Sequence, residues 1–107
     1  MLARTFILAT FLATSASAQG IYDDCPGAGK IARRMMEVRQ LGVSLTDAMK
    51  VAEGADISVR EFVVDLVKAA YSEPAYSTGE MQERSVEEFA NGIELACYNG
   101  RDQLLGK

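Results

Sequence analysis

The sequence has no histidine and no tryptophan, and cysteine and proline occur only twice each among its 107 residues. Without histidine, the chain lacks the side chain that most often acts as a general base near neutral pH and that commonly binds metal ions. Basic residues are outnumbered, eleven against fifteen acidic ones, and this balance leaves no electrostatic footprint for nucleic acid. These absences exclude most hydrolytic chemistry and predict that the protein binds no nucleic acid.

The first eighteen residues have the pattern of a signal peptide. Arg4 is their one charged side chain, an apolar run follows over residues 6–13, and Ala16-Ser17-Ala18 forms an A-x-A cleavage site. Polar residues interrupt the stretch, so it is too short for a transmembrane helix, and Cys25 lies too far from the small residues for a lipoprotein signal. We predict a signal peptide over residues 1–18, a single helical domain over 19–107, no stable membrane anchor after cleavage, and a periplasmic or secreted location.

The mature chain contains the two cysteines, Cys25 and Cys97, close to its two ends. An exported protein meets an oxidising compartment, where such a pair normally forms a bridge, and two cysteines allow only one pairing. Redox-active thiols usually have Cys-x-x-Cys spacing, which is absent here. We therefore predict a structural disulfide that stabilises a small, mildly acidic domain, with ten basic residues against fifteen acidic ones after signal cleavage.

Carboxylates are the remaining candidates for catalysis. The sequence offers two adjacent pairs, Asp23-Asp24 and Glu87-Glu88. Neighbouring residues point to different faces of an element, so neither pair converges on a substrate. We expect no catalytic residue and, with both cysteines bridged, no metal site.

Two glycines after the first cysteine resemble a phosphate-binding loop only in part. In the run 27–30 the P-loop pattern fails twice, because Asp24 stands where an earlier glycine is needed and Ile31 where a serine or threonine is needed. With Ala32 the run also fits a degenerate dinucleotide fingerprint, but no strand precedes it. We predict no bound cofactor and interpret Gly27 and Gly29 as room for close packing beside the disulfide.

Apolar residues recur at helical spacing in four segments, and no segment shows the sustained alternation of a strand. The first is expected to bury a stripe that ends in Val38 and Leu41, and the third, over 59–70, has the cleanest stripe and is expected to form the centre of the core. Turn and capping residues predict the limits of the helices: Cys25-Pro26-Gly27 to Gly42, Ser44 to Gly54, Ser58 to Ser72-Glu73-Pro74, and Ser77 to Asn99-Gly100. In the last three, an acidic residue follows the serine by three positions, at Asp47, Glu61 and Glu80.

The predicted fold is all-α, a small four-helix bundle with one short helix, closed by a disulfide between the first and last helices. The bridge requires those two helices to lie antiparallel. Side-by-side packing then places Arg33 and Arg34 near residues 87–89, and Arg39 near Glu83. The first helix is mainly basic and the last mainly acidic, so we interpret the charges as complementary neighbours; the alternative is a basic patch for an anionic partner.

Four residues are candidates for an interaction surface: Tyr71, Pro74, Tyr76 and Tyr98. Tyrosine is favoured at protein interfaces, and proline makes the loop between the last two helices rigid. The alternative interpretation is that these residues cover the end of the core.

Several short motifs together resemble a known group of proteins. They are a cysteine that opens a helix, Arg39-Gln40-x-Gly42-x-Ser44, Ala70-Tyr71-x-x-Pro74-x-Tyr76, Glu88-Phe89 in a glutamate-rich helix, and Cys97-Tyr98. In this arrangement the chain resembles a family of short exported helical proteins of Gram-negative bacteria whose function is unknown. The resemblance covers nearly the whole mature chain and implies no activity.

Three functions are compatible with these observations. The first is a non-enzymatic exported binding protein, such as an inhibitor or immunity-type partner of another protein. The second is a periplasmic stress chaperone similar to the small disulfide-bridged acid chaperones of enterobacteria, although those have a shorter cysteine spacing and a different sequence. The third is an enzyme that uses carboxylates alone, with Glu87 and Glu88 as the residues to mutate. We expect the first, with an unidentified protein as partner.

Overall fold

The computed structural model describes residues 23–104, and within this range the chain forms four helices and no strand. They are α2 (Cys25–Gln40), α3 (Leu45–Glu53), α4 (Arg60–Tyr71) and α5 (Gly79–Leu104). The all-α class and the four helices are therefore confirmed. The predicted signal peptide over residues 1–18 lies outside the described residues.

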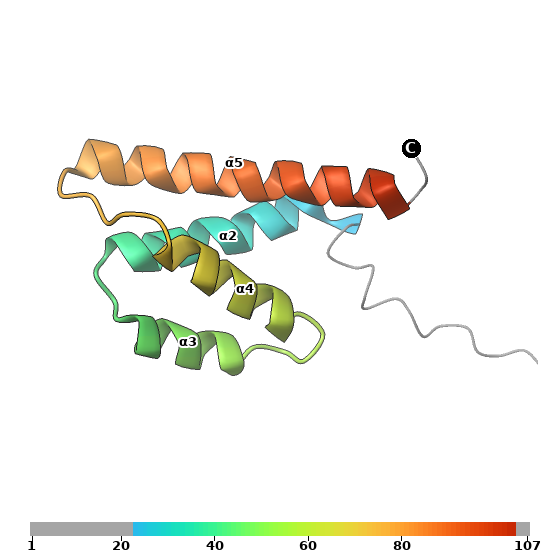
Figure 1. Cartoon of the computed structure of the whole chain (residues 1–107), viewed down its shortest axis with the longest axis horizontal. Helices are drawn as coiled ribbons and strands as arrows, with labels where there is room; N and C mark the ends of the chain where they lie inside the picture. The colour runs from blue at the N-terminus through green and yellow to red at the C-terminus, as the bar shows by residue number, and fades with distance from the viewer. Residues whose placement is uncertain (1–22, 105–107) are drawn as a thin grey trace, which may run out of the picture.

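Helix α2 is the centre of the fold. It lies antiparallel to α5, with which it has its most extensive contact, and the hairpin of α3 and α4 packs on its other side (Figure 1). Among the described helices, α5 has an extensive contact with α2 alone. None of the helices in this part of the chain is both long and apolar enough to cross a membrane.

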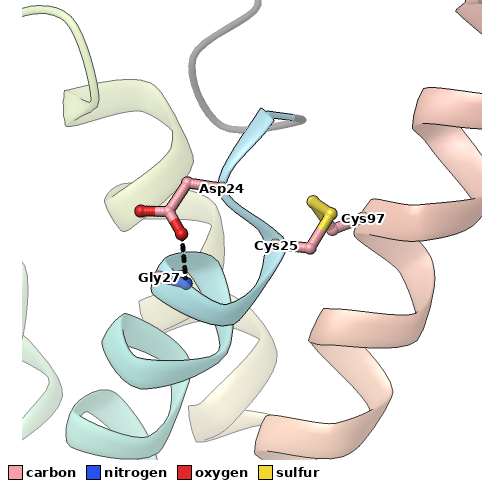
Figure 2. Close-up of a disulfide and its surroundings, with 4 residues drawn as sticks. All are labelled: Asp24, Cys25, Gly27 and Cys97. Carbon is pink, nitrogen blue, oxygen red and sulfur yellow. Dashed lines mark hydrogen bonds between the residues drawn. A yellow bond between two sulfur atoms is a disulfide. The ribbon is translucent and has the colours of Figure 1, made fainter.

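The predicted disulfide joins Cys25 at the start of α2 to Cys97 near the end of α5 (Figure 2). The two Cα atoms are 5.5 Å apart and both cysteines are buried. They form a small apolar cluster with Ala28, against which Phe62 and Tyr98 pack. The bridge therefore joins α2 and α5 at the end of the helix pair that lies outside the main core, because the larger cluster of buried residues lies further along α2.

The two glycines next to the bridge have different reasons to be glycine. A Cβ atom on Gly29 would lie 2.8 Å from Oε1 and 3.4 Å from Cβ of Glu94 on α5. A Cβ atom on Gly27 would instead collide with the carboxylate of Asp24, which caps α2 by accepting a hydrogen bond from the Gly27 N–H at 2.9 Å (Figure 2). Close packing of α2 on α5 is thus confirmed at Gly29, whereas Gly27 makes room for the cap.

The main core lies where α2, α3 and α4 meet and extends to α5 through Val86. Met36 on α2 and Val67 on α4 are its largest fully buried side chains, and α3 contributes only alanines to the buried set, at Ala48 and Ala52. Small residues allow the short α3 to lie close to α4. The expected core position of the third predicted helix is confirmed.

Most predicted helix ends are confirmed. Gly42 follows α2 with φ of 87°, a left-handed conformation that favours glycine and ends the helix. The Ser44 hydroxyl accepts a hydrogen bond from the N–H of Asp47 at 3.1 Å and caps α3, which ends at Gly54 as expected. The prediction that Leu41 would be buried was wrong. Leu41 is 80% exposed, because α2 ends one residue before it and the chain turns away from the core.

The predicted capping box at Ser58 and Glu61 is wrong. The carboxylate of Asp56 accepts hydrogen bonds from both the N–H and the hydroxyl of Ser58, at 2.9 and 2.7 Å. Ser58 is held in this turn by Asp56, and α4 begins at Arg60, after Val59, without a side-chain cap. The two hydrogen bonds also hold the pKa of Asp56 below its ordinary value.

The predicted limits of the fourth helix, Ser77 and Asn99-Gly100, were wrong at both ends. Thr78, not Ser77, caps α5, because its hydroxyl accepts a hydrogen bond from the N–H of Met81 at 3.2 Å. At the other end α5 continues through Asn99 and Gly100 to Leu104. A glycine inside a helix costs only about 1 kcal/mol, which further turns can offset.

Candidate functional site

Gln40 is a buried polar side chain at the end of α2, only 8% exposed. Its Nε2 donates hydrogen bonds to the carbonyl of Pro74 at 2.9 Å and to the Ser85 hydroxyl at 3.5 Å. Its Oε1 accepts a hydrogen bond from the N–H of Tyr76 at 2.8 Å. The side-chain amide thus pairs with backbone groups on both sides of Ala75, and it ties the α4–α5 loop to α2 and α5.

A second amide completes this attachment of the loop. The Nε2 of Gln82, in the first turns of α5, donates a hydrogen bond to the carbonyl of Tyr76 at 2.7 Å. Tyr76 is therefore bonded through its N–H to α2 and through its carbonyl to α5. A loop held in this way presents its side chains in one arrangement before any partner arrives, which lowers the entropy lost on binding.

Beside this loop the surface is hollowed between α5 and the end of α4. The hollow has a volume of about 320 Å³. We call it the α5 groove and define it by five apolar side chains: Met36, Tyr76, Met81, Phe89 and Ile93. Its lining comes from α5, from Met36 on α2, and from Glu73 and Tyr76 in the loop that follows α4.

Three charged residues line the rim of the α5 groove: Glu73, Arg84 and Glu88. All three are exposed, and none of them forms an ion pair with another described residue. Met81 on the same wall is 39% exposed. The groove therefore combines apolar side chains with a rim of two carboxylates and one guanidinium group, and polar and apolar atoms contribute about equally to its surface.

The predicted interaction residues do not form one surface. Tyr76 lines the α5 groove, and Pro74 lies next to it with its carbonyl bonded to Gln40. The hydroxyl of Tyr71 donates a hydrogen bond to the carbonyl of Val43 at 2.6 Å, so this residue closes the end of the core. Burial, the largest influence, raises the pKa of Tyr71.

Tyr98 lies at the opposite end of the helix pair, next to the disulfide. It packs against the cluster of Cys25, Ala28 and Cys97, and the guanidinium of Arg101 lies 5.0 Å from its ring centre. The sequence motif Cys97-Tyr98 is therefore structural at this end of α5, where the tyrosine helps to cover the bridge. An interaction role for the four residues stays a prediction, and the structure places Tyr76 and Pro74 together without Tyr98.

The predicted charge pairing between α2 and α5 is confirmed at one position. The guanidinium of Arg33 donates two hydrogen bonds to the carboxylate of Glu87, at 2.6 and 3.1 Å. Arg34 instead pairs with Glu37 on its own helix at 3.3 Å, and Arg39 lies away from Glu83. Arg39 stacks over the Tyr71 ring at 5.0 Å and donates a hydrogen bond to the carbonyl of Glu73 at 3.0 Å, so these two expected pairings were wrong.

We expect the Glu87 carboxyl to titrate below its ordinary pKa of 4.5, because hydrogen bonds from Arg33 favour the ionised form. A group whose pKa is lowered by folding stabilises the protein above its unfolded pKa, and this contribution is lost as pH falls through the folded pKa. The contribution is small, because both side chains are exposed to solvent. NMR titration should show the pKa of Glu87 rising in Arg33→Gln and unchanged in the control Arg34→Gln; an equal pKa in wild type and Arg33→Gln would contradict the pairing.

The carboxylates of the two adjacent pairs, Asp23-Asp24 and Glu87-Glu88, do not share a site. Asp24 caps α2, Glu87 is paired with Arg33, and Glu88 lies on the rim of the α5 groove. The described residues contain no group of three or more side chains placed to hold a metal ion.

Sequence reasoning assigned no role to Gln40 and did not predict the α5 groove, although the sequence contained a signal for the burial of Gln40. Ala28, Ala32 and Met36 recur every four residues on the buried face of α2, and Gln40 is the next position of that stripe. A glutamine in line with buried residues indicates a polar group that must find partners inside the protein.

No family model, curated protein or solved structure matches the chain, so the interpretation of the groove rests on its own residues.

Proposed function

We propose that this is an exported, non-enzymatic binding protein of the inhibitor or immunity type. It binds another periplasmic or secreted protein through the α5 groove. The observation that carries the proposal is a groove with both apolar and charged side chains, next to a loop that is held in place by the Gln40 hydrogen bonds. Fixed loops beside apolar hollows are typical of protein contact sites, because little order has to be created on binding.

Two further observations support the proposal. The buried Cys25–Cys97 bridge is compatible with an oxidising compartment. Methionine and aromatic side chains, which are enriched at interfaces, make up four of the ten residues that line the groove. The flexible thioether of Met81, which is 39% exposed, allows the groove to adapt to the shape of a partner.

The test is capture of a stoichiometric partner from periplasmic extract with wild type and two matched variants. Met81→Asp places a charge at the mouth of the groove, whereas Val51→Asp makes the same change on α3, where the side chain is 65% exposed and does not line the groove. We expect the partner to be retained by wild type and Val51→Asp and lost with Met81→Asp. Absence of any partner that depends on Met81, under several growth conditions, would overturn the proposal.

The acid-chaperone alternative is favoured by one observation, the Arg33–Glu87 pair that links α2 to α5. Protonation of Glu87 at low pH would remove this link and favour separation of the two helices. The test is acidification to below the carboxyl range with an apolar dye and an aggregating client protein. If neither dye binding nor protection of the client appears, this alternative is wrong.

A further inference from the structure

We infer that the segment of the partner that enters the α5 groove is a basic amphipathic helix. This inference rests on the proposed function and names the chemistry of the partner. The secondary structure of the walls, the length of the groove and the charges of its rim support it.

The walls of the groove favour a helix over an extended strand. An added strand needs a free sheet edge with unpaired N–H and C=O groups, and the described residues contain no strand. The long wall is one face of α5, where Met81, Phe89 and Ile93 follow one another at helical spacing. A helix that presents apolar side chains at three- and four-residue spacing is the element that packs into such a wall.

The length of this wall sets the length of the segment. Residues 81–93 of α5 rise by about 18 Å at 1.5 Å per residue, which corresponds to a little more than three helical turns of a partner. A helix of this length buries about four apolar side chains on one face. The hollow of about 320 Å³ matches partial insertion of such side chains and leaves the polar face of the partner in water.

The rim determines the sign of the partner's charge. Glu73 lies in the loop that follows α4 and Glu88 lies on α5, so there are carboxylates on both walls, while Arg84 is the single cation among the described residues that line the groove. The exposed Glu80 and Glu83 line a different hollow, beside Arg33 and Glu87, so the negative sign of this rim rests on Glu73 and Glu88. A partner with lysine or arginine beside its apolar face is therefore attracted, and one with glutamate there is repelled.

The experiment uses two labelled probe peptides of about 15 residues, one built from leucine and lysine and one from leucine and glutamate in the same amphipathic pattern. Fluorescence anisotropy measures their binding to the mature, disulfide-bonded protein at low and at physiological salt. We expect the leucine–lysine peptide to bind about tenfold more tightly than the leucine–glutamate peptide, with the difference decreasing as salt rises.

Matched variants separate the groove from the general negative charge of the protein. Glu73→Lys with Glu88→Lys reverses the rim, and Glu53→Lys with Asp65→Lys makes the same change in net charge at exposed positions that do not line the groove. We expect the rim variant to reverse the preference and the control variant to keep it. Circular dichroism and thermal unfolding check that both variants are folded.

Several outcomes would overturn the inference. They are tighter binding of the leucine–glutamate peptide, binding of neither peptide, or an equal loss of binding in the rim and control variants. In each case, a partner captured in a Met81-dependent manner would show that the groove binds a protein of different chemistry, and the proposed function would stand. Preferential binding of the leucine–lysine peptide that Met81→Asp does not weaken would place the site outside the groove and also contradict the inference.

Discussion

Replacement of Cys25 and Cys97 by alanine is expected to lower the free energy of unfolding by about 4 kcal/mol. The bridge joins residues separated by 72 positions, and it stabilises the fold because it reduces the conformational entropy of the unfolded chain. Small domains have a total stability of about 5–15 kcal/mol, so this loss consumes a large part of it. Alanine is the appropriate substitute because both positions are buried, and a serine hydroxyl would add an unsatisfied polar group.

The measurement is denaturant unfolding of the oxidised wild type, the reduced wild type and the double variant. The reduced protein and the variant should unfold at similar, lower denaturant concentrations. Hydrogen exchange should in addition show the largest loss of protection near Cys97, because α5 is the last of the described helices and, among them, has an extensive contact with α2 alone. Unchanged stability of the double variant would show that the native packing holds the two helix ends together without the bridge.

Replacement of Gln40 by alanine is expected to lower the free energy of unfolding by about 2–3 kcal/mol. The change removes hydrogen bonds to Pro74 and Tyr76 and leaves a cavity at a position that is 8% exposed. The loss is moderated because Pro74 is exposed and water can reach its carbonyl. The loop that carries Tyr76 should also become mobile, so the α5 groove should bind its partner more weakly than the loss of stability alone explains.

Gln40→Glu provides a sharper form of the same test. A carboxylate at this position still accepts the hydrogen bond from Tyr76 but cannot donate one to Pro74, and its burial raises the pKa of the new group. A group whose pKa is raised by folding is tolerated below its unfolded pKa, and stability is lost as pH rises through the folded pKa. The variant should therefore be close to wild type in acid and destabilised at neutral pH.

The control for both variants is Gln82→Ala, which removes a single hydrogen bond from a half-buried side chain to the carbonyl of Tyr76. Its expected loss is about 1 kcal/mol, without the pH dependence of Gln40→Glu. Stability of Gln40→Glu that does not vary with pH relative to wild type would contradict the role assigned to the Gln40 amide.

The wrong pairings of the arginines show where sequence reasoning about α2 stopped. Matching positions along an antiparallel pair placed Arg33 correctly opposite Glu87. The same rule failed for Arg39, because six residues rotate a side chain by about 240° around a helix axis. Arg39 therefore faces Tyr71 and the end of α4, and the position around the axis follows from which neighbours pack on each side.

The wrong helix ends have a similar cause on a smaller scale. Ser58 and Ser77 both have the spacing of a capping box, but Ser58 is bonded to Asp56 in the preceding turn, and Thr78 offers the same kind of hydroxyl as Ser77 one residue later. Ser44 has no such competitor in the structure, and its cap was predicted correctly. Local motifs therefore indicate that a helix begins nearby, while competing groups decide the residue.

The sequence by itself determined the all-α class, the four helices, the single possible disulfide and hence the antiparallel arrangement of α2 and α5. These features depend on the spacing of apolar residues along one helix and on one covalent bond, both of which are written in the order of residues. Only the tertiary structure decided that Gln40 is buried and satisfied, that α4 and α5 diverge on α2, and that Met36, Tyr76 and Phe89 line one groove. The physical reason is that a groove depends on the relative angles and rotations of several helices, which result from packing among distant residues and leave no periodic pattern in any one segment.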